Sequence, residues 1–180
     1  MTSFANSAHL QAFLQQDVEI GTATFLLDIA SGVIRRHVGW SISEETVQLT
    51  TQGTGDNVIW LPTKFLTVIT SVVEDGVTLI FGTHYRWTST GRLRRLSGRW
   101  TCEEQSVVVT FTHGYDPVPD DVRGVCVSLA GRFYNNPDGL RQWTVGGISQ
   151  TVAGSADGIT GMLSDDEKAQ LSQFEILSVA

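Results

Sequence analysis

The sequence has 180 residues, a net charge of −7 and a hydrophobic fraction of 41%. This length suits one domain, or one domain that carries an insert, and the apolar content is sufficient for a core. Charged residues make up 17% of the chain and glycine accounts for 18 positions, which is typical of β structure with many turns or of a subunit that buries surface in partners. The acidic balance argues against a protein that grips DNA by its phosphates, because such binding needs basic patches.

Neither export nor a membrane span is predicted. The first 19 residues contain no basic region followed by an apolar stretch, and no apolar run reaches the roughly 18–20 residues needed to cross a bilayer. Cys102 and Cys126 lack the spacing of a metal site, and two buried free thiols are favoured over a disulfide. We therefore expect a chain made in a reducing cytoplasm, without a metal or another cofactor.

Two helices are predicted at the start of the chain. The first covers residues 7–16, with Ser7 as its N-cap and an apolar face of Leu10, Phe13 and Leu14. The second covers residues 20–38, where apolar residues recur at helical spacing. It ends in a basic turn followed by Gly39, as suits the negative end of a helix dipole.

Residues 41–113 change to the period of strands. Asp75-Gly76 lies between two apolar runs and predicts a hairpin, and Ser89-Thr90-Gly91 predicts a second turn. Apolar residues alternate again in 106–112, SVVVTFT. The pattern predicts an antiparallel meander or a small barrel, partly filled by three tryptophans, Trp60, Trp87 and Trp100.

Helical period returns after Pro119. A third helix is predicted over 120–134, capped by Asp120 or Asp121, and a fourth over 164–174, where Ser164 and Glu167 fit a capping box. The glycine- and serine-rich stretch between these helices, 145–161, is read as a flexible linker rather than a phosphate loop.

The predicted fold class is α+β. Helices from 1–40 and 114–180 form a small bundle with a C-terminal arm, and 41–113 form a β insert that leaves and re-enters between two helices. Neither the first two helices nor the third has enough apolar partners alone, so 20–38 and 120–134 are expected to pack together.

We find no catalytic constellation in the sequence. The four histidines are scattered, and neither a nucleophile elbow, a P-loop nor a dinucleotide-binding glycine motif occurs. The acidic run 165–167 is explained by helix capping, and Asp116, Asp120 and Asp121 lack the ligand pattern of a calcium loop. An enzyme is therefore not expected.

One basic run is present, in GRLRRLSGRW at 91–100. It either contacts DNA or an acidic neighbouring subunit, or it is a solvated hairpin tip. The candidate contact residues are Arg92, Arg94, Arg95 and Arg99.

Three stretches resemble one known family, the head–tail adaptor (connector, or head-completion) proteins of long-tailed phages. They are HLQAFLQQDVEIGTATFLLDIASGVIRRHVG, IWLPTKFLTVITSVVEDGVTL with HYRWTSTGRLRRL, and VTFTHGYDPVPDDVRGVCVSLAGRFYNNPDG. The third is the most distinctive. With GGISQT and LSDDEKAQL they cover nearly the whole chain.

The resemblance implies a virion structural protein at the head–tail junction, assembled in the host cytoplasm. It implies a ring, commonly of twelve subunits, that docks on the portal and meets a stopper or tail-terminator protein on its far side. Phage DNA would pass through without sequence-specific contact, and no membrane is involved. On this hypothesis the apolar residues of the C-terminal arm, Leu171, Phe174 and Leu177, dock on the portal or on a neighbouring subunit.

Two alternatives stay open. A stopper or tail-completion protein belongs to the same junction, although the two long helices argue against it. A β-type carbohydrate-binding module, with Trp87 and Trp100 as its platform, belongs to a different class.

Overall fold

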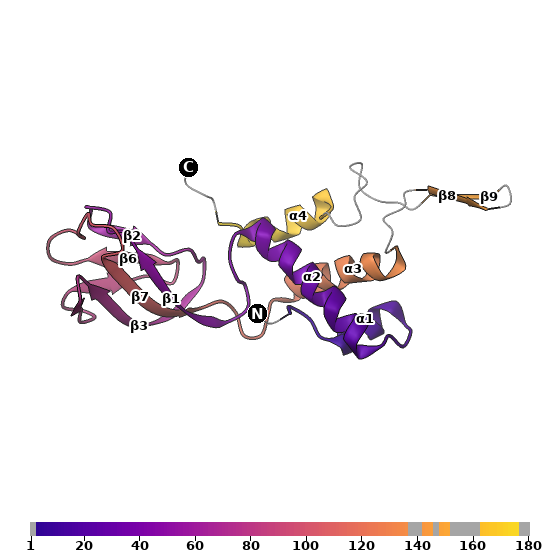
Figure 1. The fold of residues 1–180 in the computed structure, drawn as a ribbon, viewed down its shortest axis with the longest axis horizontal. Helices are drawn as coiled ribbons and strands as arrows, with labels where there is room; N and C mark the ends of the chain where they lie inside the picture. The colour runs from indigo at the N-terminus through magenta and orange to yellow at the C-terminus, as the bar shows by residue number, and fades with distance from the viewer. Residues whose placement is uncertain (1–2, 137–141, 146–147, 152–162, 177–180) are drawn as a thin grey trace. The chain divides into compact units, whose positions relative to one another are not determined.

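The computed structural model describes residues 3–136, 142–145, 148–151 and 163–176 (Figure 1). The chain divides into two compact units. We call Met1–Val38 with Val118–Glu175 the helical unit, and Gly39–Pro117 with Ile176–Ala180 the β unit. The α+β class predicted from the sequence is confirmed. None of the described helices is both long and apolar enough to cross a bilayer.

The helical unit contains α1 (Ser7–Leu14), α2 (Ile20–Val38), α3 (Asp120–Asn135) and α4 (Asp165–Leu171), the last continued by the 3₁₀ turn η1 (Ser172–Phe174). All four predicted helices are present, with α1, α2 and α3 ending within two residues of the expected bounds and α4 reaching residue 174 only together with η1. The N-caps of α1 and α3 differ from those predicted.

The N-cap of α1 is Asn6 and not Ser7. The Asn6 side chain accepts a hydrogen bond from the His9 amide, and the His9 ring accepts one from the Asn6 amide. Helix α3 begins after Pro119 without any side-chain cap, so Asp120 and Asp121 lie inside its first turn. There the two carboxylates still oppose the positive end of the helix dipole.

Helices α2 and α3 pack together as the sequence predicted. The fully buried side of α2 contains Ala23, Leu27, Ala30 and Ile34. The Cys126 thiol of α3 lies 3.4 Å from the Ser31 hydroxyl. Figure 1 shows the two helices side by side, with α1 against them. Helices that are far apart in sequence therefore form one bundle.

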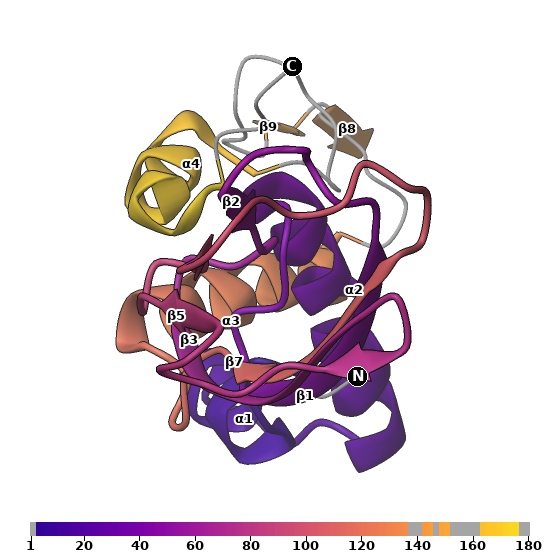
Figure 2. The same cartoon turned by 90° about the vertical axis from the view of Figure 1, so that its left-hand side faces the viewer.

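The described residues of the β unit form seven strands in two antiparallel sheets. One sheet has the order β1 (Glu45–Thr51), β7 (Val107–His113), β3 (Leu66–Glu74), β4 (Val77–Thr78), and the other has the order β2 (Val58–Trp60), β6 (Arg92–Arg95), β5 (Tyr85–Trp87). Figure 2 turns this unit toward the viewer, with β1 and β7 on one side of its interior and β2 on the other. A simple meander is therefore wrong for the first sheet, because β1 pairs with β7, the strand furthest from it in the insert.

Both predicted turns are present. Asp75 and Gly76 have positive φ angles of 49° and 78° between β3 and β4, which suits the turn of a tight hairpin. Residues 88–91 connect β5 to β6. One apolar core is shared by the two sheets, with Leu93 of β6 and Val109 and Phe111 of β7 fully buried.

The three tryptophans expected in this core differ in burial. Trp100 is 1% exposed and Trp87 packs at the edge of the core, but Trp60 is 65% exposed. Placing Trp60 inside was wrong because its neighbour Ile59 is the residue of β2 that faces the core, and side chains alternate along a strand.

A third sheet has two strands, β8 (Gln142–Val145) and β9 (Ile148–Thr151), of which β9 lies within the stretch 145–161 read as a linker and β8 ends at its first residue. Val145 pairs with Ile148, so two residues separate the strands. That linker reading was wrong here, because Gly-Gly between two short runs is also a hairpin signal. Gly154, Gly158 and Gly161 lie outside the described residues.

Candidate interaction surfaces

The outer side of the β2–β6–β5 sheet carries three arginines and a tryptophan. Leu93 is fully buried, so its neighbours Arg92 and Arg94 point away from the core. Trp60 lies directly opposite Arg92 on one side of β6, and Arg86 lies opposite Arg94 on the other. We call Trp60, Arg86, Arg92 and Arg94 the basic face.

Two arginines of the basic face are paired unfavourably. Side chains directly opposite each other in antiparallel strands have Cβ atoms about 4.5–5.5 Å apart, and like charges at that distance destabilise the pair. Arg86 and Arg94 occupy such positions and both are exposed. Within the described chain no carboxylate forms an ion pair with either of them or with Arg92.

The other two arginines of the predicted run do not belong to this face. The Arg95 guanidinium lies 2.8 Å from the Glu74 carboxylate and 5.3 Å from the ring centre of Trp100, and its side chain is 17% exposed. Arg99 follows β6 and lies 3.9 Å from Asp56. The structure therefore places Arg92 and Arg94 on the basic face, turns Arg95 to Glu74, and leaves Arg99 exposed after the end of β6.

Sequence reasoning missed Arg86 and Trp60. The turn at 88–91 fixes the register of β5 against β6, and this register could have placed Arg86 opposite Arg94. Charge distribution was a second signal. Residues 57–102 contain six of the 12 Lys and Arg residues but two of the 19 Asp and Glu residues, a net charge of +4 in a chain of −7.

The arrangement of the basic face suits an anionic partner. A guanidinium presents a planar set of donors that binds a carboxylate or a phosphate in bidentate fashion. The exposed ring of Trp60 adds an apolar contact beside Arg92. Neither group is a nucleophile or a general acid or base near neutral pH, so the chemistry of the face suits binding.

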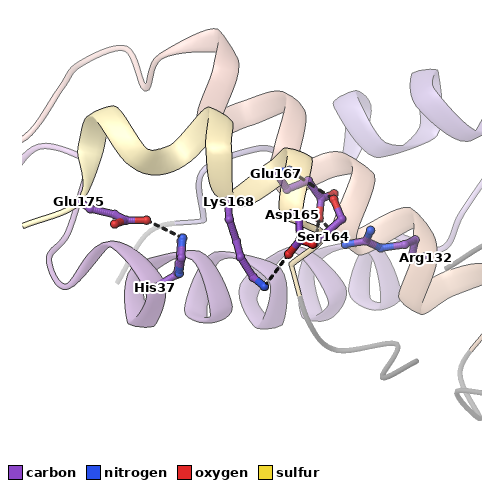
Figure 3. A network of polar contacts seen from close by, with 7 residues as sticks. All are labelled: His37, Arg132, Ser164, Asp165, Glu167, Lys168 and Glu175. Atoms are coloured by element: carbon purple, nitrogen blue, oxygen red, sulfur yellow. Dashed lines mark hydrogen bonds and ion pairs between the residues drawn. The ribbon is translucent and has the colours of Figure 1, made fainter. Parts of the chain in front are cut away.

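A second cluster of charges holds α4 against the other helices (Figure 3). The Ser164 hydroxyl accepts from the Glu167 amide, and the Glu167 carboxylate accepts from the Ser164 amide at 2.8 Å, which completes the predicted capping box. The same carboxylate lies 2.7 Å from the Arg132 guanidinium of α3. Glu175 lies 2.8 Å from His37 at the end of α2.

Two of the three predicted docking residues face inward. Leu171 is fully buried and Phe174 is 8% exposed, so in the single subunit both pack inside the helical unit. Leu177 lies outside the described residues. The outward side of α4 and η1 is polar and includes Asp166, Gln170 and Gln173. Docking through Leu171, Phe174 and Leu177 stays a prediction.

The two cysteines also differ from expectation in part. Cys126 is buried, and burial raises the pKa of its thiol, which keeps it protonated and unreactive. Cys102 is exposed, so the expectation of two buried thiols was wrong for it. Both thiols are free. Among the residues with described side chains, no three His, Cys, Asp or Glu side chains gather in a way that could hold a metal ion.

Comparison with known proteins decides the family. The model of the head completion protein family matches residues 14–159. The chain belongs to the head completion protein family. It is a structural protein of the virion, located at the head–tail junction, as the resemblance of its sequence motifs had implied.

Solved structures share the fold of this head completion family member. It is similar to a chain in the neck of a native gene transfer agent particle, computed with C12 symmetry, at 14% identity and a TM-score of 0.64 over 100% of this chain and 95% of that one. A chain from the neck of the empty particle, computed with C6 symmetry, matches at 17% identity and a TM-score of 0.61 over 98% and 91%. No curated protein matches the sequence.

Proposed function

We propose that this head completion family member is an adaptor subunit. Twelve copies form a ring that docks on the portal and extends the DNA channel toward the tail, where it meets a stopper or tail-terminator protein. The role is structural and involves no catalysis. The observation that carries the proposal is the similarity of fold, over nearly the full length of both chains, to a chain in a particle neck that was computed with C12 symmetry.

The charge of the chain supports this role. A net charge of −7 gives no general attraction for DNA, so the duplex can slide past the ring without being held. A ring also needs two different contact surfaces on each copy, because its contacts are heterologous. The helical and β units differ enough in composition to supply two such surfaces.

The test is a measurement of assembly. Mass photometry and negative-stain imaging of the purified chain, alone and mixed with portal protein, should show a ring on the portal with a mass twelve times that of the 19.7 kDa chain. A chain that stays monomeric with portal at every concentration would contradict the proposal. So would its location in virions anywhere other than between capsid and tail.

We further propose that the C-terminal arm, with Leu171, Phe174 and Leu177, makes the portal contact. Because Leu171 and Phe174 are buried, their substitution should weaken the fold as well as portal binding. Leu177→Ala is therefore the sharper test, and it should weaken portal binding more than it lowers the melting temperature. Unchanged portal binding by this variant would exclude Leu177 from the contact. Gln170→Ala, on the outward side of α4, serves as the control.

The carbohydrate-binding alternative loses its support in the structure. A sugar platform made by Trp87 and Trp100 needs both rings accessible, and Trp100 is 1% exposed.

A further inference from the structure

The basic face leaves an electrostatic problem within the single subunit. Arg86 and Arg94 lie directly opposite each other on β5 and β6, and Arg92 lies one alternation further along the same side of β6. The β2, β5 and β6 strands contain no acidic residue. A partner with negative charge would relieve this repulsion and would gain guanidinium hydrogen bonds.

The composition of the face favours a protein partner over DNA. Trp60 is 65% exposed and Val58, opposite Arg94, is half-buried, so apolar surface adjoins the guanidiniums. Trp and Arg together are enriched in protein interfaces. Duplex DNA offers phosphates to the arginines but little apolar surface for the tryptophan, because the faces of its bases are stacked on each other. The net charge of −7 also opposes the approach of a polyanion.

A second copy of this chain has the complementary charge. Outside residues 57–102, the chain has 17 Asp and Glu residues against six Lys and Arg residues, so the remainder of a neighbouring copy is strongly acidic. A heterologous contact joins two different surfaces of the same protein, and here a basic face can meet carboxylates from a part of the chain in which they outnumber the basic residues. Lateral association of like copies is thereby favoured in one orientation, basic face against acidic surface.

We propose that the basic face is the lateral contact through which one copy binds the acidic surface of the next copy in the ring. Trp60 provides the apolar centre of this contact, and the arginines bind carboxylates of the neighbour. The inference rests on the proposed ring and adds to it the residues and the chemistry of the contact between copies.

Arg86→Glu tests the proposal while leaving the fold intact. This substitution places a carboxylate opposite Arg94, so it removes the cross-strand repulsion and the melting temperature should stay equal or rise. Ring assembly should nevertheless weaken, by about tenfold or more in the concentration needed. Arg99→Glu makes the same change of charge outside the face and should assemble like the natural chain.

Salt gives a second readout on the natural chain. Contacts between exposed charges are screened, since the Debye length shortens from about 10 Å at 0.1 M to about 3 Å at 1 M salt. Assembly should therefore weaken as salt rises. Assembly of Arg86→Glu at the natural concentration would overturn the lateral contact and leave the proposed ring standing. A natural chain that never assembles, even with portal, would overturn both.

A photo-crosslinking residue in place of Trp60 identifies what covers the face. Mass spectrometry of rings assembled on portal should show crosslinks to a second copy of this chain. Crosslinks to portal protein alone would overturn the proposal. The same is true of crosslinks to DNA alone in filled particles, which would instead assign the face to the channel.

Discussion

The α4 cluster and the basic face both carry charge, but their charges are used differently. Around α4, the Glu167 carboxylate pairs with the Arg132 guanidinium at 2.7 Å and the Glu175 carboxylate contacts the His37 ring at 2.8 Å, both within the same chain. On the basic face, three guanidiniums share one side of a sheet and form no ion pair within the described residues. Charges of the first kind hold a subunit together, whereas charges of the second kind are available to a partner. Substitutions at the two places should therefore separate stability from assembly.

The largest effect is expected at Leu171. Its side chain is fully buried, so Leu171→Ala removes apolar contacts and leaves a cavity, and the free energy of unfolding should fall by about 2–5 kcal/mol. Urea unfolding followed by far-UV circular dichroism measures the loss. Gln170→Ala, one position earlier and exposed, is the control and should change little. An equal, small effect for both variants would show that α4 is not held in the way described.

A smaller loss is expected at Glu167. Its carboxylate joins the Ser164 amide to the Arg132 guanidinium, and its side chain is 10% exposed. Glu167→Ala should lower the free energy of unfolding by about 2 kcal/mol, because a charge-assisted pair and a helix cap are lost together. Asp166→Ala, at the neighbouring exposed carboxylate, provides the comparison. Equal losses of unfolding free energy for the two variants would contradict the stabilising contacts assigned to the Glu167 carboxylate.

His113 should make the β unit sensitive to acid. Burial lowers the pKa of His113 below its ordinary value, and the Glu45 carboxylate, 3.7 Å from Nε2, opposes this only in part. The folded state therefore keeps the ring neutral, while the unfolded chain takes up a proton below about pH 6.5. The contribution to stability is complete above that pH and is lost as pH falls toward the folded pKa.

The pH effect is measured as the difference in free energy of unfolding between the natural chain and a variant without His113. The free energy of unfolding of the natural chain and of His113→Gln, followed from pH 8 to pH 5, should converge as pH falls, since the other titrating groups are common to both. Curves that run parallel throughout would show that folding does not lower the pKa of His113.

The smallest effects on stability are expected on the basic face. Arg86→Glu should raise the free energy of unfolding by about 0.2–1 kcal/mol, because opposite charges replace like charges across β5 and β6. Trp60→Ala should change it by less than about 0.5 kcal/mol, since the ring is mainly exposed. Loss of stability at these positions as large as at Leu171 would erase the distinction between the two regions.

Much of the helical unit could be predicted because its signals are local. The helical spacing of apolar residues over 20–38 and the capping box at Ser164 and Glu167 each lie within a few turns of chain. The hairpin at Asp75-Gly76 is local in the same sense, since two residues with positive φ define it. The family resemblance rested on the same local stretches, and the family match over 14–159 confirms it.

The tertiary structure decided which residues lie beside one another in the sheet and which are buried. The basic run was visible in the sequence, but only the pairing of β6 with β2 and β5 shows that Arg92 and Arg94 share a side with Trp60 and Arg86, while Arg95 turns to Glu74. Likewise the apolar stripe of the last helix was evident, but only packing shows that Leu171 is buried within its own subunit. The sequence determined these elements because hydrogen bonding within a helix or a tight turn depends on neighbouring residues. The pairing of distant strands and the burial of a helix face depend on residues that the chain brings together only when it folds.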